Sequence, residues 1–444
     1  MIAPAGLLAR AQISANVLYD PLEGMADAAR RYGDVVGYGL GRVSVVQITH
    51  PDAIEAMLHL PAEKTRKTRV LRWLQELLGN GMLTADAAAW RPRRKLAAPS
   101  FTPKAIGHYA AVMQEETAKA VAGLPEGNVD VYPMILELTR KIAERTLFGD
   151  DVEVDGAAVT EALDVWTRAF HRRTNSFGRL FPERASEIRE RTDAKKKLDE
   201  ALFAAIRRRR ALPDGDDLLG RLIASRGEND GSAFDDEDLR DEIVTLFVAG
   251  HETTALWLGY AIRALAAHPG AAARARIEAD SATSSGPAAL RGMAWTGAAL
   301  DEVLRLRPPG FAVGRELVGD TDLAGVVLPA GTQVIAPTWV VHHDARWWAD
   351  PQVFRPERWL APEAGGDGTA ALAPRGAFFP FGGGSRVCIG NHFAKMEALI
   401  VVAEMLRRFD LAPEPTDVES WLPSATIRPV AGVRVQLRRR GTAG

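Results

Sequence analysis

The chain has 444 residues, of which 47% are hydrophobic and 25% charged, proportions typical of a globular protein with a sizeable core. Its 55 basic and 57 acidic residues leave a formal net charge of -2, so no overall positive field favours nucleic acid or a membrane as a partner. The single cysteine, Cys388, excludes an intramolecular disulfide, a cysteine-based zinc finger and a multi-cysteine iron–sulfur cluster. No stretch reaches the ~18–20 apolar residues that span a bilayer, and no targeting signal is visible, so we expect a cytoplasmic protein.

Helical periodicity dominates the chain, and strand-like segments are few and short. The predicted helices are Pro103–Gly123, Val131–Leu147, Arg184–Arg210, Asp235–Ala267, Pro287–Leu306 and Asn391–Phe409. The predicted strands are Val35–Leu40 and Val43–Ile48, which form a hairpin, and Phe311–Leu317, Thr332–Ile335 and Val433–Leu437. This pattern predicts a mainly α fold with small β-sheets, in one domain over residues 1–444.

The segment Asp235–Ala267 is unusual because it predicts one helix long enough to cross a whole domain. It opens with acidic residues, which suit the positive end of a helix dipole, and a His-Pro pair ends it. In its middle lie Gly250, which costs about 1 kcal/mol relative to alanine, and the polar pair Glu252 and Thr253. Taken alone, this run is equally typical of a helix-packing glycine with a glutamate on the surface.

The segment 378–390 surrounds the cysteine and is the most informative part of the sequence. Successive glycines from Gly382 onward let the backbone turn freely and let a bulky group approach it closely. Cys388 precedes the last long helix, whose N–H groups and dipole are expected to favour a thiolate, and Arg386 adds a cation nearby. Phe381 is positioned to wall one face of a site. Two other interpretations are a small buried cysteine and a cysteine nucleophile served by His392.

The pattern Phe381-x-x-Gly384-x-Arg386-x-Cys388-x-Gly390 resembles the haem-binding loop of the cytochrome P-450 family, and every fixed position matches. The resemblance implies a P-450 fold with a long central helix over heme b (iron protoporphyrin IX). It also implies that the Cys388 thiolate is the proximal ligand of the iron, which favours O–O cleavage. We therefore expect a haem-thiolate monooxygenase that takes O2 as co-substrate.

The middle of the long helix is similar to the oxygen-activation motif of the same family. The resemblance implies that Gly250 opens a groove for dioxygen and that Ala249 beside it contacts the haem. It further implies that Thr253 hydrogen-bonds the oxygen and that Glu252 helps to relay protons from solvent. The intact acid–alcohol pair favours dioxygen with external electrons over the peroxide-using branch of the family.

Further matches follow the order in which the family carries them. Trp90 and Arg94 resemble the Trp-x-x-x-Arg helix that binds a haem propionate. Arg315 follows a Pro-Pro turn at a position where many members bind a propionate, and Arg386 matches a further contact. Phe381 and Gly382 complete the expected haem contacts.

Glu302 and Arg305 lie on one face of a predicted helix. They resemble the first two members of a buried family network whose third member is Arg358 here. Such pairs on their own are usually weak surface contacts. The resemblance implies a structural role, in which the network holds in place the segment 378–390 around Cys388, called the cysteine loop below.

The family also indicates which segments wall the substrate pocket. The corresponding residues here are Val70, Leu71, Trp73, Leu74, Phe170, Phe177, Leu246, Phe247, Phe311, Ala312, Val313, Thr426 and Ile427. Each of them is equally consistent with ordinary core packing. Their composition favours a hydrophobic substrate such as a terpenoid, steroid, fatty acid or macrolide-like compound, which the enzyme hydroxylates or epoxidises.

The resemblance to the soluble bacterial type implies how electrons arrive. We expect NAD(P)H electrons to come through a separate ferredoxin or flavodoxin and its reductase, with no fused reductase and no membrane anchor, and we expect a monomer. Two other function classes stay open at this point. One is a haem sensor or carrier without turnover, against which the Glu252–Thr253 pair argues, and the other is a Cys–His hydrolase.

Overall fold

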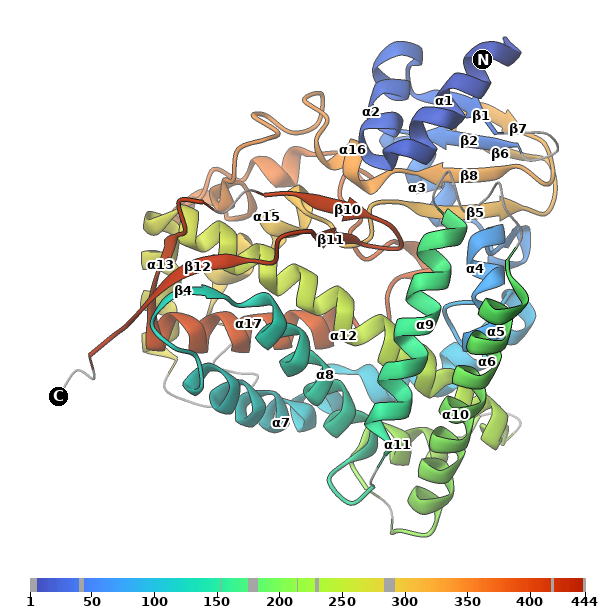
Figure 1. Cartoon of the computed structure of the whole chain (residues 1–444). Helices are drawn as coiled ribbons and strands as arrows, with labels where there is room; N and C mark the ends of the chain where they lie inside the picture. The colour runs from blue at the N-terminus through green and yellow to red at the C-terminus, as the bar shows by residue number, and fades with distance from the viewer. Residues whose placement is uncertain are drawn as a thin grey trace.

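Helices make up most of the structure, and the strands gather into small sheets (Figure 1). The computed structural model describes residues 6–39, 44–152, 154–174, 183–213, 215–227, 231–282, 292–416 and 419–441. The helices are α1 (Leu7–Tyr19), α2 (Pro21–Tyr32), α3 (Pro51–Leu58), α4 (Arg69–Trp73), α5 (Gln75–Leu78), α6 (Ala87–Ala97), α7 (Pro103–Ala122), α8 (Tyr132–Phe148), α9 (Gly156–Thr174), α10 (Ala185–Arg210), α11 (Leu218–Ala224), α12 (Asp236–Ala267), α13 (Pro269–Ser281), α15 (Ala294–Leu306), α16 (Thr338–His342) and α17 (Asn391–Arg408). The strands are β1 (Val35–Tyr38), β2 (Val45–Ile48), β3 (Thr65–Arg66), β4 (Gly127–Asp130), β5 (Val313–Leu317), β6 (Thr321–Leu323), β7 (Val326–Leu328), β8 (Gln333–Ala336), β9 (Phe409–Pro413), β10 (Trp421–Pro423), β11 (Ile427–Pro429) and β12 (Arg434–Arg439). The predicted mainly α fold with small β-sheets is confirmed.

The long helices follow the sequence periodicity: α7, α8, α10, α12, α15 and α17 correspond to the predicted segments. The predicted start of α15 at Pro287 lies outside the described residues. Several helices are absent from the prediction, among them α1, α2, α9 and α13. A signal for α2 was present, because Asp20 accepts hydrogen bonds from the N–H groups of Leu22 and Glu23 just before Pro21.

The largest sheet has the strand order β1–β2–β8–β5–β3. β1 and β2 form the predicted antiparallel pair, with Val35 opposite Ile48, and the turn residues 40–43 lie outside the described part of the chain. β8 pairs in parallel with β2 and antiparallel with β5, so segments far apart in the sequence lie side by side. A second sheet places β12 between β4 and β9, and β10 and β11 form a separate short hairpin.

α12 crosses the middle of the molecule (Figure 1) and packs against α8, α10, α15 and α17. Asp235 caps its start by accepting a hydrogen bond from the N–H of Asp238. Most of the helix is buried, but residues 248–253 are exposed or half-buried, and Ala249 is exposed. A break in burial halfway along a central helix indicates that this stretch borders a space inside the protein.

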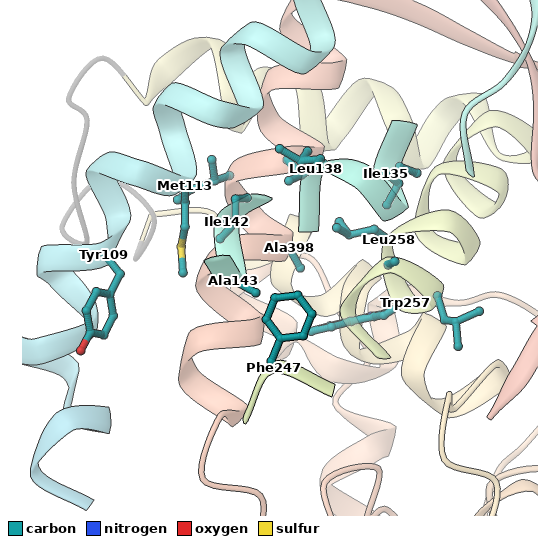
Figure 2. Packing of buried hydrophobic residues seen from close by; sticks show 14 of the residues in the cluster. Tyr109, Met113, Ile135, Leu138, Ile142, Ala143, Phe247, Trp257, Leu258 and Ala398 are labelled. Atoms are coloured by element: carbon teal, nitrogen blue, oxygen red, sulfur yellow. The ribbon is translucent and has the colours of Figure 1, made fainter. Parts of the chain in front are cut away.

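The core joins the central helices through side chains that interlock. Figure 2 shows Met113 of α7, Ile142 of α8, Trp257 of α12 and Ala398 of α17 in one cluster, and all four are at most 2% exposed. The Trp257 indole N–H is not left unpaired, because it donates to the carbonyl oxygen of Leu300 at 3.0 Å. This packing keeps α12 fixed relative to α17, the helix that follows the cysteine loop.

We expect Ile142→Ala to lower the free energy of unfolding by about 2–5 kcal/mol, because the removed methyl groups leave a cavity in a fully buried site. The control is Ile277→Ala on α13, where the side chain is 67% exposed and the expected change is below about 0.5 kcal/mol. Denaturant or thermal unfolding of both variants measures the difference. Equal destabilisation by the two substitutions contradicts this account of the core.

Candidate active site

The cysteine loop makes a tight turn that depends on its glycines. Gly384 has φ +61°, and a Cβ there would lie 2.1 Å from the carbonyl oxygen of Leu58, so a side chain is excluded. Gly382 has φ +70°, and nothing lies within 4 Å of where its Cβ would be. The N–H of Cys388 donates to the carbonyl oxygen of Phe381 at 2.9 Å and closes the loop. The turn thereby places Cys388 in the same loop as Gly382, whose backbone faces open space.

The Cys388 side chain is exposed to solvent, although dense protein surrounds it. A side chain that is both accessible and enclosed lines an internal space rather than the outer surface. Burial raises the pKa of the Cys388 thiol, while the N–H of Gly390 and the charge of Arg94 lower it by less. The helix start and a nearby cation thus favour the thiolate in the direction expected, but desolvation of the sulfur outweighs them.

The Gly250–Thr253 stretch of α12 is placed near the cysteine loop. Trp257, one helical turn after Thr253, lies edge-on to Phe381 with ring centroids 6.0 Å apart. Nothing lies within 4 Å of a Cβ built on Gly250, and Ala249 beside it is exposed. The two motifs are therefore neighbours in the fold, although they are far apart in the sequence.

The two threonines of the motif bond to their own helix. The Thr253 hydroxyl donates to the carbonyl oxygen of Ala249 at 2.6 Å, and the Thr254 hydroxyl donates to that of Gly250 at 2.8 Å. Hydroxyl bonds to the carbonyl one turn back compete with the helix ladder and often bend a helix. The Thr253 hydroxyl proton is thus engaged in a hydrogen bond with a backbone carbonyl oxygen, at the least buried part of α12.

The Glu252 carboxylate is held by the β10–β11 hairpin. Its Oε1 accepts hydrogen bonds from the Thr426 hydroxyl at 2.8 Å and Arg428 Nε at 2.6 Å, and its Oε2 accepts from Arg428 Nη2 at 2.8 Å. Burial raises the pKa of Glu252, but the hydrogen bonds and charge of Arg428, with Thr426 and His251, leave it below its ordinary value. Glu252 is therefore ionised at neutral pH. Arg428 was not expected at this position, because no local sequence pattern links residues 252 and 428.

Four basic side chains lie near the cysteine: Lys67 and Arg315 are buried, and Arg94 and Arg386 are half-buried. Burial lowers the pKa of Arg315 to about 10, and burial together with Arg315 lowers that of Arg386 to about 10, so both remain charged at neutral pH. Arg386 stacks on the Trp90 ring with its Cζ 4.1 Å from the centroid. Within the described residues none of the four cations forms an ion pair.

Lys67 was not predicted to belong to this group. It is 7% exposed, and burial together with Arg315 and Arg386 lowers its pKa well below the ordinary value. Asp86 is the nearby carboxylate that raises the pKa of Lys67 and of Arg386. Four cations beside one carboxylate make a site that attracts further negative charge.

The residues present fit a haem group. A thiol sulfur is a haem-iron ligand, and the bare backbone at Gly250 and Gly382 leaves room for a flat ring. The unneutralised cations suit the two carboxylates that haem carries as propionates. Cys388 would bind the iron, and Trp90, Arg94, Arg315 and Arg386 would hold the propionates, with Lys67 added by the structure.

The Glu302 carboxylate forms the centre of a buried network. Arg305 donates to both of its oxygens at 3.0 and 2.8 Å, and Arg358 donates to Oε1 at 3.0 Å. The Trp359 indole and the backbone N–H of Arg355 donate to it as well, at 2.8 and 3.1 Å. The side chains of Glu302, Arg305 and Arg358 are at most 1% exposed. The structure thus brings together the three residues singled out in the sequence.

His342 connects this network to the cysteine loop, and nothing in the sequence pattern indicated it. Arg305 donates to the backbone carbonyl oxygen of His342 at 2.8 Å. The ring Nε2 of His342 in turn accepts a hydrogen bond from the N–H of Phe379 at 3.1 Å, at the start of the cysteine loop. The same ring stacks on Phe378. Burial lowers the pKa of His342 well below its ordinary value, so the ring is neutral and can accept this bond.

The predicted pocket residues fall into two groups. The half-buried ones are Val70, Leu71, Leu74, Leu246, Phe311, Ala312 and Val313. The buried ones are Trp73, Phe170, Phe247, Thr426 and Ile427. Phe177 lies outside the described residues. Trp73 packs on Trp166 and Phe170, with ring centroids 5.4 and 6.3 Å away, and Thr426 is used to hold Glu252.

The structure does not support the alternative in which Cys388 is a nucleophile served by His392. His392 is exposed at the start of α17. Within the described part of the chain no hydrogen bond joins it to Cys388.

Fold and site together define a protein built to hold haem through a thiolate. The chain belongs to the cytochrome P450 family, whose model, described as "Cytochrome P450", matches residues 16–431. It is therefore a P450 monooxygenase, of a family that uses haem-thiolate and O2, and the predicted enzyme class is confirmed. No described helix combines the length and apolar character needed to cross a membrane.

Relatives cover most of the chain. Cyclooctatin synthase of Streptomyces melanosporofaciens is 31% identical over 406 residues, which are 90% of this chain and 85% of that protein. Cyclooctat-9-en-7-ol 5-monooxygenase of the same organism is 31% identical over 393 residues, covering 86% and 84%. Putative cytochrome P450 135B1 of Mycobacterium tuberculosis is 33% identical over 427 residues, covering 92% and 85%. The solved structure of retinoic acid bound cyanobacterial CYP120A1 has a TM-score of 0.83 at 25% identity and covers 96% of both chains.

We expect Glu302→Ala to lower the free energy of unfolding by about 3–5 kcal/mol, because Arg305 and Arg358 lose their buried counter-ion. Haem retention should fall with it, since the network supports the cysteine loop through His342. In the control, Glu419→Ala removes a more exposed pair with Arg307 and should cost less than about 1 kcal/mol. Unfolding curves and the haem-to-protein absorbance ratio measure both effects. Similar values for the two variants contradict the structural role of Glu302.

Proposed function

We propose that this P450 inserts one oxygen atom of O2 into a terpenoid-type hydrophobic substrate, with electrons supplied by a separate ferredoxin or flavodoxin and its reductase. The balanced reaction is R–H + O2 + 2 electrons + 2 protons → R–OH + H2O, and NAD(P)H is the ultimate electron source. The proposal is supported above all by the accessible Cys388, the basic side chains near it, and the contact of Trp257, one turn after Thr253, with Phe381 of the cysteine loop.

The assigned roles of the chain's own residues follow from their chemistry. Haem, when bound, supplies the iron that activates dioxygen, and a thiolate ligand favours cleavage of the O–O bond. Cys388 would provide that sulfur, and Arg94, Arg315 and Arg386, with Lys67, would offset the propionate charges. Because burial raises the pKa of the Cys388 thiol, the metal is what makes the thiolate the stable form.

Thr253 and Glu252 are assigned to proton delivery. The Thr253 hydroxyl presents a proton donor at the open part of α12, where the backbone carbonyl oxygen of Ala249 accepts its hydrogen bond. Glu252, which is ionised, accepts protons from solvent and passes them towards that hydroxyl. Gly250 leaves the space in which dioxygen sits beside the helix.

The terpenoid class is supported by two kinds of observation. The half-buried predicted pocket residues are all apolar, from Val70 to Val313. The names of two relatives specify a cyclooctatin synthase and a monooxygenase of cyclooctat-9-en-7-ol, an alcohol on a hydrocarbon skeleton. Steroids, fatty acids and macrolide-like compounds share the apolar character, but the names of the relatives reported above do not specify them.

The proposal is tested by titrating the haem-loaded enzyme with a panel of terpenoid, steroid, fatty-acid and macrolide-like compounds. We expect Soret-band shifts for terpenoids, and hydroxylated or epoxidised products when ferredoxin, its reductase and NAD(P)H are added. Shifts and products confined to another compound class overturn the terpenoid assignment. No product and no substrate-linked electron consumption across the whole panel favour a haem sensor or carrier.

We expect Cys388→Ala to abolish thiolate ligation, because the chain contains only one cysteine. The measurement is the spectrum of the reduced carbon monoxide adduct, in which the thiolate-type Soret band should disappear. The control is Ser385→Ala in the same loop, which should keep the band, since Ser385 is exposed. A thiolate-type band in the Cys388→Ala variant contradicts the assignment.

We expect Thr253→Ala to keep its haem but to release peroxide or water in place of product. The yield of product per electron should fall on the order of ten-fold, less than the 10²–10⁴ typical of a proton-transfer group because water can replace the hydroxyl. Thr192→Ala is the control, because it removes an exposed hydroxyl that donates to a carbonyl oxygen one turn back, that of Ile188. An unchanged yield in Thr253→Ala removes this residue from the mechanism.

A further inference from the structure

The loop between α5 and α6 packs directly on the first half of α12. The N–H of Asn80 donates to Asp241 Oδ2 at 2.7 Å, and the N–H of Met82 donates to Glu242 Oε2 at 3.2 Å. A Cβ on Gly81 would lie 2.6 Å from the carbonyl oxygen of Asp241, so only glycine permits this close approach. The loop is therefore held to α12 by two carboxylates, and that of Glu242 is fully buried.

Helix α6 approaches the same part of α12 through Arg93. The guanidinium forms an ion pair with Asp238, and its Nε lies 3.7 Å from Glu242 Oε1. The side chain of Arg93 is 16% exposed and that of Glu242 is 0% exposed, so solvent screens this contact little. Trp90 and Arg94, the two residues of α6 assigned to a haem propionate, lie within one helical turn of Arg93. The distance between Arg93 and α12 therefore affects where these two residues are held.

The contact between Arg93 and Glu242 relies on charge. Arg93 donates from Nη1 to the carbonyl oxygen of Ala89 at 3.1 Å, and from Nη2 to Asp238. Its Nε and the Oε1 of Glu242 are both buried, and neither has a hydrogen-bond partner within the described residues. When Glu242 is neutral, its hydrogen bond from the N–H of Met82 can persist, but the Coulombic attraction to Arg93 is lost.

The charged groups packed around Glu242 come from three helices: Asp238, Arg240 and Asp241 of α12, Arg93 of α6, and Asp199 of α10, which pairs with Arg240. Burial raises the pKa of Glu242 to about 8, because one hydrogen bond from Met82 and the charge of Arg93 do not offset the lost hydration. The aspartates at 238 and 241 raise this pKa further. The carboxyl group of Glu242 is therefore mostly protonated at pH 7 and mostly ionised at pH 9.

We propose that Glu242 is a positioning residue: its ionised form draws Arg93 to α12 and fixes α6 for tight haem binding, and its protonated form lets α6 shift and release haem faster. A small shift is enough, because charge-assisted bonds to a carboxylate depend on the geometry of the donors. The inference rests on the proposed function only through the haem, since it adds a pH response to the helix that binds a propionate. Neither the substrate nor the electron donor enters it.

The test measures the transfer of haem from the full-length, haem-loaded enzyme to an excess of apomyoglobin, followed by absorbance at pH 7 and pH 9. In the wild-type enzyme we expect transfer to be about five-fold slower at pH 9, the lower end of the usual coupling between two sites. In Glu242→Gln, which cannot ionise, the rates at both pH values should match the wild-type rate at pH 7. The matched control is Glu237→Gln, which should keep the wild-type pH dependence because Glu237 is exposed on the same helix.

Variants of Arg93 test the partner of Glu242. Arg93→Gln should also remove the pH dependence of haem transfer, because the charge of Glu242 then has no cation to attract. Arg93→Lys keeps a cation at this position, so it should retain more of the pH dependence than Arg93→Gln does. If Glu242→Gln does not fold with haem, these two variants decide the outcome.

An infrared titration identifies the group that ionises. The band of a protonated carboxyl group that is absent in Glu242→Gln belongs to Glu242, and in the wild-type enzyme this band should lose half of its intensity near a pH of about 8. In Arg93→Gln the half-point should move to higher pH, because the cation no longer favours the ionised form.

Four results overturn the proposal. They are a wild-type pH dependence of haem transfer in Glu242→Gln, the same in Arg93→Gln, a loss of pH dependence in Glu237→Gln equal to that in Glu242→Gln, and an infrared band that does not change between pH 7 and pH 9. Failure of the proposed function takes a different form, that of a haem-loaded enzyme that yields no product with any substrate or electron donor, and it leaves the haem-transfer rates intact.

Discussion

The arrangement of the site depends on one buried carboxylate, that of Glu302. It accepts hydrogen bonds from Arg305, Arg358 and Trp359 in the absence of solvent, so the three donors must meet at one point. Arg305 also donates to the backbone carbonyl oxygen of His342, and the His342 ring accepts a hydrogen bond from the N–H of Phe379. These bonds connect Glu302 to the cysteine loop. The cysteine loop is therefore held from one side by a network that tolerates no missing partner.

A second constraint is electrostatic. The protein places Lys67, Arg94, Arg315 and Arg386 in a poorly solvated region with little negative charge of its own. Burying cations that have no counter-ion lowers the stability of the folded chain. Burial also disfavours ionisation of the Cys388 thiol. Both costs are reduced by a single ligand that brings two carboxylates and a metal ion. Cofactor binding and stability are coupled in such a site, because the folded chain is arranged for charges that it does not itself supply.

α12 joins the two sides of the chemistry. Its core contacts with α8 and α17 fix the helix, while the stretch around Gly250 and Thr253 stays accessible. Glu252 lies on the same stretch but is held by β11 from the far end of the chain. The middle of α12 and the hairpin of β10 and β11 are thus linked through the Glu252 carboxylate.

The sequence by itself was sufficient for the long helices, the family and the residues of the two central motifs. Periodicity defines a helix locally, and the spacing around Cys388 or Glu252 lies within one turn or loop. It was not sufficient to predict the contacts of Arg428, Lys67 and His342, because their partners are distant in the chain. It was also not sufficient to predict β4 and β9, which are strands only because β12 pairs with both. The net pKa of Cys388 was not predictable for the same reason: the helix start that lowers it is local in the sequence, whereas the desolvation that raises it depends on every element packed around the sulfur. Burial and long-range pairing are properties of the folded chain, so tertiary structure alone decided them.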